Sequence, residues 1–306
     1  MSRTSPAPTS SRYAGVLWGF LGILAFSFTL PFTRVAVETI SPFFMTTGRA
    51  TLAAAFALIA FVLVRPKKPS RRQIARLVVV ALGVVVGFPL FTSLALQSVP
   101  SAHGTVVIAL LPAVTALFVV LRTGERPGVL FWVASIAGAA AVVIFLALGN
   151  GFSGVSLPDL YLVLAVVLAA IGYTEGGLLS RELGSWQTIC WALIISLPVM
   201  APLTAINAWF IPLSQEPVAW LCFLYTAVFS MFLGFFAWYR GLAIGPMTTV
   251  SQVQLTQPVL TLVWSALILG EVLTPDILIG GAVIIGLAFT AVRARVKTLQ
   301  PPSVSK

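Results

Sequence analysis

The chain has 306 residues, of which 59% are hydrophobic and 8% are charged, and its mean hydropathy is +1.04. Because soluble domains carry about 25% charged residues, this composition excludes an ordinary soluble protein. The net charge of +10 would suggest nucleic-acid binding in a soluble protein, but here we interpret it as a topology signal and expect no nucleic-acid partner. Cys190 and Cys222 lie in apolar segments and His103 is the single histidine, so we expect no disulfide framework, no metal site and no cofactor.

Apolar runs of about 20 residues, long enough to cross a ~30 Å hydrocarbon core, follow one another along nearly the whole chain. Such runs are helices, because backbone polar groups in lipid must bond within their own segment. The ten predicted helices, separated mostly by Pro and Gly, span residues 14–33, 43–64, 75–96, 102–121, 128–148, 158–180, 186–206, 217–239, 247–269 and 276–293. We therefore predict an all-α polytopic membrane protein with ten transmembrane helices.

Lysine and arginine are distributed unevenly over the predicted loops. If the N-terminus is cytoplasmic, all of the 18 Lys and Arg residues lie on the cytoplasmic side except Arg34, which lies outside, and Arg49, which lies within the second helix. Cytoplasmic loops of membrane proteins carry such an excess of basic residues. We therefore expect a multi-pass protein of a bacterial inner membrane with cytoplasmic N- and C-termini.

A segment of the fourth predicted helix recurs near the end of the chain. Residues 96–126 align without a gap on residues 242–272, an offset of 242 − 96 = 146 residues. The matched positions include Pro112 with Pro258, and the dipeptide Gly–Glu that ends each segment. Internal repeats in a helical membrane chain are the usual architecture of secondary transporters, with the substrate held between the halves.

Each half contains five predicted helices, and this odd number inverts the second half relative to the first. We assign residues 1–12 and 296–306 to cytoplasmic tails, the first of them disordered, residues 13–150 to the first repeat and residues 151–295 to the second. Two inverted repeats around a central cavity favour alternating access, because exchanging the conformations of similar halves turns an outward-open state into an inward-open one.

These features resemble the drug/metabolite transporter superfamily over roughly residues 13–295. The resemblance lies in the ten helices in two inverted repeats, in Arg49 placed eight residues into the second helix after Ser41–Pro42, and in the Gly–Glu that closes the fourth and ninth helices. Within the superfamily the chain is similar to EamA-type ten-helix exporters, and among these to YddG-type amino acid exporters. The resemblance alone implies export as the direction. Small four-helix multidrug members carry a proton-coupling acid in their first helix, which residues 13–33 lack.

The ninth helix carries the most polar stripe of the chain. Gln254, Gln257, Thr261 and Ser265 fall within about 80° on a helical wheel. Uncharged amides in hydrocarbon are costly unless they face protein or water. Two interpretations stay open: the stripe lines a cavity for a polar or zwitterionic solute, or it only forms interhelical hydrogen bonds.

Aromatic residues supply a second group of cavity candidates. Phe26 lies on a small-residue face of the first helix, and its repeat partner is Tyr173, so the two could clamp a solute. The alternative, which small-residue faces more commonly serve, is close helix packing. Most tryptophans lie near helix ends as interfacial anchors, whereas Trp18 and Trp264 lie deeper and are also cavity candidates.

Prolines within predicted helices are candidate hinges. Pro112 and Pro258 sit mid-helix at matched positions, and Pro89 interrupts the third helix. Interior prolines remove a backbone hydrogen bond and kink helices. These kinks either flex beside the cavity during transport or are static features of the packing.

Three ionisable residues are charged or gating candidates. Arg49 and Glu175 are the only charges well inside the predicted helices, and such charges are functional candidates by default. Arg49 could also snorkel or lock helices together, and Glu175, near the cytoplasmic end, favours a structural ion pair or an interfacial position. His103 stands at the outer mouth of the fourth helix, where we consider a gating or proton role.

We conclude that the chain is a secondary transporter of small polar metabolites, with a small-molecule substrate and the lipid bilayer as its partners, and that amino acid export is the leading hypothesis. Alternatives are an exporter or antiporter of other metabolites or drugs; binding a phosphorylated solute would need two embedded cations, and only Arg49 qualifies. An intramembrane enzyme lacks its usual paired Asp, Ser with a base, or His cluster. We expect flux without obligatory proton exchange, and a monomer is compatible with the sequence.

Overall fold

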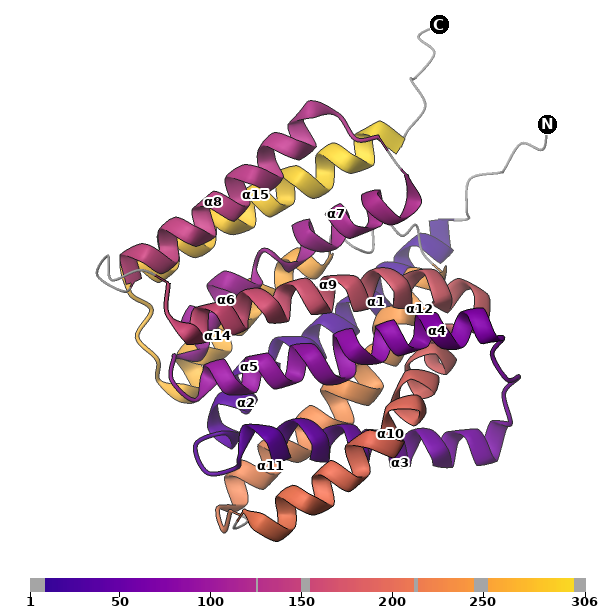
Figure 1. The fold of residues 1–306 in the computed structure, drawn as a ribbon. Helices are drawn as coiled ribbons and strands as arrows, with labels where there is room; N and C mark the ends of the chain where they lie inside the picture. Colours follow the sequence, from indigo (N-terminus) through magenta and orange to yellow (C-terminus); the bar gives the residue numbers. More distant parts are fainter. Residues whose placement is uncertain (1–8, 125, 150–154, 212–213, 245–252, 300–306) are drawn as a thin grey trace, which may run out of the picture.

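The computed structural model describes residues 9–124, 126–149, 155–211, 214–244 and 253–299, and this part of the chain is helical with no strand (Figure 1). Among the described residues, nine helices are long and apolar enough to cross a membrane. A shorter apolar helix, Gln254–Leu269, lies where the ninth span is predicted, and the start of that prediction falls in residues 247–252, outside the described residues. The prediction of an all-α polytopic membrane protein is confirmed.

Several membrane passes are built from two or three consecutive helical elements. The elements are α1 (Thr9–Ser27), α2 (Thr29–Ala36), α3 (Pro42–Val64), α4 (Arg71–Val80), the π-helix η1 (Ala81–Gly87), α5 (Phe88–Leu96), α6 (Ser101–Ile108), α7 (Leu111–Thr123), α8 (Val129–Gly149), α9 (Leu157–Leu183), α10 (Ser185–Phe210), α11 (Pro217–Tyr225), the π-helix η2 (Thr226–Leu233), α12 (Gly234–Ile244), the 3₁₀ turn η3 (Gln254–Thr256), α14 (Gln257–Leu269) and α15 (Pro275–Leu299). The third pass begins at Arg71, four residues before its predicted start, because Ser70 and Gln73 form a capping box.

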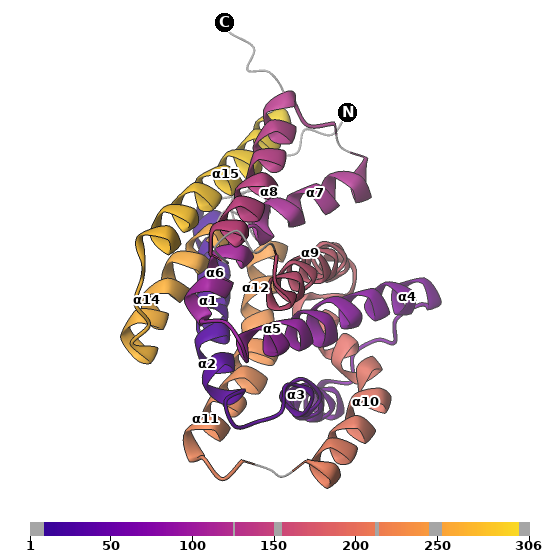
Figure 2. The same cartoon turned by 60° about the vertical axis from the view of Figure 1, so that its left-hand side comes forward.

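Helix pairing follows the expected inverted symmetry. The second passes of the two halves, α3 and α10, pack together on one flank, and the fifth passes, α8 and α15, pack together on the opposite flank (Figure 2). Between the flanks, α1 packs on α12, while the equivalent helix α9 packs on η1 and α5. The fourth and ninth passes meet where α6 packs on α14. The second, fourth and fifth passes therefore contact their equivalents in the other half, and the contact of the first pass with the eighth is repeated by that of the sixth with the third.

Interruptions of the helices also occur at matched positions. The π-helices η1 and η2 lie in the third and eighth passes, and residues 81 and 227 in them are separated by the same offset, 227 − 81 = 146. In the fourth and ninth passes, Pro112 and Pro258 are each the second residue of a new helix, α7 and α14. Proline is favoured there because the first turn of a helix does not use its N–H groups. Pro89 takes the same position in α5.

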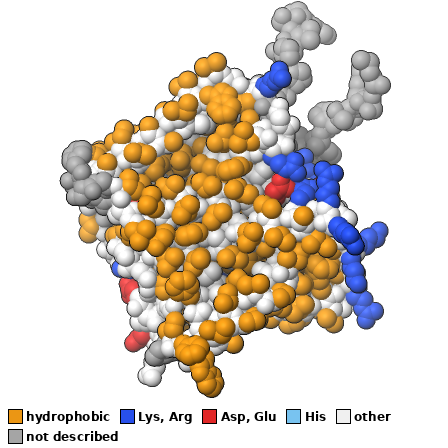
Figure 3. Space-filling view, viewed as in Figure 1, with side chains coloured by type: hydrophobic (Ala, Val, Ile, Leu, Met, Phe, Trp, Pro, Cys, Tyr) orange, Lys and Arg blue, Asp and Glu red, His pale blue; other side chains and the backbone are white. Residues whose placement is uncertain are grey.

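The bundle has two chemically different ends. Near the basic end, where α3 ends and α4 begins, lie Arg65, Lys67, Lys68, Arg71, Arg72 and Arg76. Figure 3 shows Lys and Arg side chains gathered mostly along this edge, beside a face covered by apolar side chains. At the other end, which we call the capped end, α6 and α9 begin and two carboxylates, Asp159 and Glu271, bind helix N-termini.

Candidate functional site

The polar stripe of the ninth pass divides into two parts. Thr261 Oγ1 donates to the carbonyl oxygen of Ser27, 2.9 Å away, and Ser265 Oγ lies 2.5 Å from Ser101 Oγ. These two residues therefore bind neighbouring helices. Gln254 and Gln257 are also buried; they line cavities between the two halves, and Thr261 lines one of these cavities as well. Hydrogen bonding between helices therefore accounts for Thr261 and Ser265, whereas Gln254 and Gln257 stay candidates for a solute cavity.

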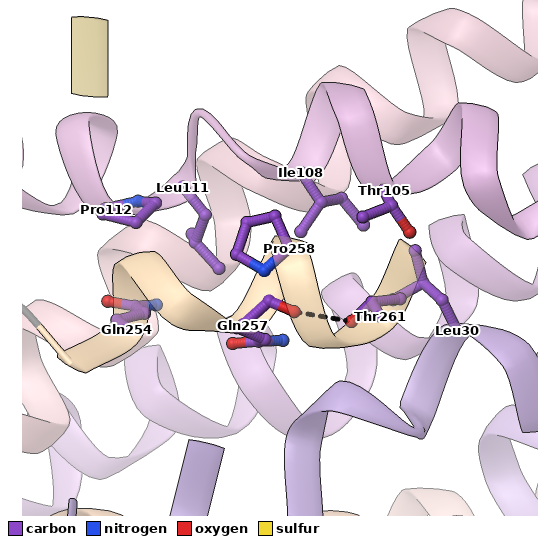
Figure 4. A pocket seen from close by; sticks show the side chains of 9 residues that line it. All are labelled: Leu30, Thr105, Ile108, Leu111, Pro112, Gln254, Gln257, Pro258 and Thr261. Carbon is purple, nitrogen blue, oxygen red and sulfur yellow. Dashed lines mark hydrogen bonds between the residues drawn. The ribbon is translucent and has the colours of Figure 1, made fainter. Parts of the chain in front are cut away.

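A first cavity, of about 10 Å³, lies between the broken helices of the fourth and ninth passes. In Figure 4, Pro112 and Leu111 at the start of α7 stand opposite Gln254 of η3 and Pro258 at the start of α14. We call it the proline cavity; its lining residues are Leu30, Thr105, Ile108, Leu111, Pro112, Gln254, Gln257, Pro258 and Thr261. Two of the three proline hinge candidates, Pro112 and Pro258, therefore lie at the contact between the halves.

A second cavity, of about 60 Å³, extends from Gln254 towards the basic end. We call it the Trp238 cavity; its lining residues are Pro112, Thr115, Ala116, Val119, Tyr173, Thr174, Gly177, Leu178, Trp238, Leu242, Gln254 and Val292. Three of these residues have a buried polar atom without a partner in the described part of the chain: Thr115 Oγ1, Trp238 Nε1 and Gln254 Nε2. Since buried polar groups are normally hydrogen-bonded, this cavity offers binding groups to water or to a solute.

A third cavity, of about 20 Å³, lies beside Arg49. We call it the Arg49 cavity; its lining residues are Phe26, Thr29, Arg49, Val84, Phe88, Pro89, Tyr173, Ser230, Met231, Phe235 and Gln257. Arg49 is only 2% exposed, which argues against the alternative that it snorkels to the interface. It lies two turns inside α3 and lines this cavity within the bundle.

The three cavities share lining residues and so form one linked system. Gln254 and Pro112 line both the proline and Trp238 cavities, Gln257 lines the proline and Arg49 cavities, and Tyr173 lines the Trp238 and Arg49 cavities. Their volumes suffice for water molecules alone. In this conformation the cavities formed by the described residues are too small for a larger solute.

The aromatic pair predicted from the repeat lies within this system. The rings of Phe26 and Tyr173 stack with centroids 6.5 Å apart, and Phe235 lies 4.9 Å from Phe26. The small-residue face of α1 packs closely: a Cβ on Gly22 would lie 2.7 Å from the backbone nitrogen of Trp238. The glycines thus serve helix packing, while the two aromatic rings line the cavity.

The two tryptophan candidates lie elsewhere. Trp18 is 43% exposed beside the exposed residues Leu17 and Leu21, which corrects its prediction as a cavity residue. Its position on α1 is rotated away from the glycine face that packs on α12. Trp264 Nε1 donates to Ser27 Oγ at 3.0 Å, and its ring lines none of the three cavities. Trp264 therefore ties α14 to α1.

Glu175 lies outside the linked cavities, in an ion-pair network at the basic end. Its carboxylate accepts from Arg76 Nε at 2.6 Å and from Arg122 Nε, and Arg76 also reaches Glu182 at 2.6 Å. The network joins α4 and α7 of the first half to α9 of the second. Sequence reasoning missed these partners because they are far from Glu175 along the chain.

His103 is also outside the cavities. Its Nε2 lies 2.8 Å from Oδ1 of Asp159, a fully buried carboxylate that also accepts from the backbone N–H of Ser156 at the start of α9. Nearby, Glu271 accepts hydrogen bonds from the backbone N–H groups of Ser101 and Ala102 at 2.8 and 2.7 Å. Asp159 follows Ser156 by three residues, which is the spacing of a capping box at a helix start; this pattern could have identified Asp159 from the sequence, but it was not used.

Comparisons with known proteins agree with this architecture. The profile of the EamA-like transporter family matches residues 13–147 and 156–293. The chain is 46% identical over 260 residues to "Uncharacterized transporter YdeK" of Bacillus subtilis (strain 168), covering 84% of this chain and 89% of that protein. A crystal structure with 21% sequence identity has a TM-score of 0.63, covering 94% of this chain and 100% of that one, and shows the fold alone. The chain therefore belongs to the EamA-like transporter family and is a membrane-embedded transporter of small molecules, not an enzyme.

Proposed function

We propose that this protein is an alternating-access carrier that exports amino acids or similar small zwitterionic metabolites across the bacterial plasma membrane. The observation that carries the proposal is the linked cavity system where the two inverted halves meet. It is bordered by helices that break at matched positions, as expected where a substrate binds in a transporter built from inverted repeats.

The chemistry of the cavity walls supports a polar solute of small size. The Gln254 amide nitrogen, the Thr115 hydroxyl and the Trp238 indole N–H are buried without a partner among the described residues. Phe26, Tyr173 and other aromatic or aliphatic side chains form the remaining walls. A few convergent polar groups in an apolar cavity are typical of small-molecule sites.

The orientation of the carrier follows from its charge distribution. The basic end would lie in the cytoplasm, because cytoplasmic loops carry the excess of Lys and Arg. In a variant lacking Cys190 and Cys222, Ser70→Cys at the basic end and Asp276→Cys at the capped end test this orientation. An impermeant thiol reagent should label only Asp276→Cys in intact cells. Labelling of both from outside would reject the proposed topology.

Counterflow in proteoliposomes tests the substrate class. The purified protein is reconstituted and screened with labelled amino acids, sugars and phosphorylated metabolites. We expect counterflow with at least one amino acid, and its reduction by Gln254→Leu and Gln257→Leu of at least tenfold. A merely structural loss would be smaller, because hydrogen bonds between transmembrane helices average about 0.6 kcal/mol, or about threefold.

A matched control separates the cavity from general damage. Gln97→Leu makes the same substitution at an exposed position where α5 ends, outside the cavities. Its counterflow should equal that of the unaltered protein. Full activity in folded Gln254→Leu and Gln257→Leu would show that these amides do not line the transport path, and counterflow confined to sugars or phosphates would reject the amino acid proposal.

A further inference from the structure

Arg49 is a buried cation without a partner in the part of the chain that the structure describes. Its guanidinium forms no hydrogen bond or ion pair with any described residue, and its Nε is fully enclosed. Burying an unpaired charge is costly, and in membrane segments such charges pair or mark a functional path. The side chain therefore requires a counter-charge.

The described part of the chain has no carboxylate to supply it. Five of its seven Asp and Glu residues are engaged elsewhere: Glu38 with Arg34, Asp159 with His103, Glu175 and Glu182 with Arg76, and Glu271 with the start of α6. The other two, Glu216 and Asp276, are exposed at the starts of α11 and α15. A counter-charge for Arg49 must then come from outside this part of the protein.

The cavity beside Arg49 carries further hydrogen-bonding groups. Thr29 Oγ1 and Ser230 Oγ lie 2.8 Å apart on its wall, from α2 and η2. The Tyr173 hydroxyl and the Gln257 side-chain amide line it as well, and neither has a partner among the described residues. One guanidinium beside neutral donors suits a single carboxylate, which a guanidinium can bind through two parallel hydrogen bonds.

We propose that Arg49 binds the carboxylate of the transported solute in this cavity. The inference rests on the proposed function and adds the group that recognises the substrate. Because the volume of the cavity is about 20 Å³ in this conformation, a carboxylate can enter only when the walls of the cavity move apart. Substrate binding would then neutralise Arg49 and be coupled to the movement of the halves.

The deciding experiment compares acids with their amides. For the amino acid found by counterflow, competition by the acid is measured against competition by its carboxamide, which keeps the shape and loses the negative charge. The unaltered protein should prefer the acid by at least tenfold. In Arg49→Gln this preference should fall to about twofold or less, whereas Arg49→Lys should keep part of it, because Lys retains the charge without the planar fork.

Two controls separate recognition from folding. Arg34→Gln removes another arginine, one that donates to the Leu96 carbonyl at the capped end, and should leave the acid preference unchanged. Tyr173→Phe removes one hydroxyl from the cavity and should weaken the binding of the acid and the binding of the amide by different factors. If Arg49→Gln does not fold, the preference is measured in Arg49→Lys and Tyr173→Phe. An unchanged preference in the folded Arg49 variants would overturn the proposal.

A binding measurement distinguishes failure of this proposal from failure of the proposed function. In detergent, acetate should raise the Tm of the unaltered protein more than acetamide or chloride, and Arg49→Gln should remove the difference. This result would support the carboxylate site even if no amino acid is transported. An equal effect of chloride would assign the site to inorganic anions and overturn the proposal, as would equal effects of acetate and acetamide.

Discussion

The two ends of the bundle are closed by different kinds of interaction. At the basic end, Arg76 and Arg122 pair with Glu175; the Arg122 side chain is 45% exposed, whereas those of Arg76 and Glu175 are 16% and 10% exposed. At the capped end, Asp159 is fully buried and pairs with His103, while Ser101 and Ser265 are buried and bonded to each other. Partly exposed ion pairs are weakened by water and salt, whereas buried polar contacts are costly to break.

This difference indicates which end opens more easily. Thr174 lines both the Trp238 cavity and an open hollow of about 420 Å³ beside the ion pairs of Glu175. The cavity system thus approaches the surface at the basic end, where Arg122, one of the closing side chains, is exposed to water. We infer that this conformation opens first towards the basic end.

The largest expected effect comes from Asp159→Ala at the capped end. The change leaves His103 and the N–H group of Ser156 without their buried partner. Removing one member of a buried pair costs about 3–5 kcal/mol, so we expect the free energy of unfolding in detergent to fall by about that much. The exposed Glu216→Ala at the start of α11 is the control and should change it by less than about 0.5 kcal/mol. A similar loss of stability in both variants would contradict the view that the buried contacts of Asp159 hold the capped end together.

Glu271→Gln should have the next largest effect. The substitution keeps the shape but removes the charge that faces two N–H groups at the start of α6. A carboxylate at a helix N-terminus contributes about 0.3–2 kcal/mol, so a loss of about 1 kcal/mol is expected. Thermal unfolding measures it. If the Tm does not change, the contact does not hold the capped end closed.

Glu175→Gln tests the basic end. Glutamine keeps one side-chain oxygen that can still accept from Arg76 or Arg122, so the loss of the charge should change stability by only about 1 kcal/mol, but it should ease opening. In a variant without Cys190 and Cys222, Leu178→Cys in the Trp238 cavity should react faster with a thiol reagent when Glu175→Gln is added. Glu271→Gln serves as the matched change at the other end. Equal acceleration by both would remove the distinction between the ends.

The smallest expected effect is that of the pH gradient on transport. The groups nearest to a titrating role, Glu175 and His103, line none of the three cavities, and each is engaged with charged partners. A coupling proton must bind differently in the two facing states. We therefore expect solute-gradient flux to persist when a protonophore collapses the pH gradient, and His103→Gln to change it less than twofold. Uphill accumulation on an imposed pH gradient would contradict this view.

Much of the fold followed from local patterns in the sequence. The lengths of the apolar runs predicted the passes, because a helix needs about 20 residues to cross the bilayer. Gly124 and Gly270, which close the fourth and ninth predicted helices, do end α7 and α14, in left-handed conformations with φ of 71° and 66°. The repeat also paired Phe26 with Tyr173, whose rings stack. Repetition and length are properties of the chain itself and need no knowledge of packing.

Other features depended on how the helices are rotated and which neighbours they meet. The spacing of the polar stripe could not separate Gln254, whose amide nitrogen has no partner among the described residues, from Thr261, which is hydrogen-bonded to Ser27 of α1. Likewise, the position of Trp18 along the first predicted helix could not show that it lies on the exposed side of α1. The sequence by itself determined the inverted helical repeat and Arg49 as a charge within it. Only the tertiary structure decided that Arg49 faces a cavity and has no partner among the described residues, because its surroundings come from helices far apart along the chain.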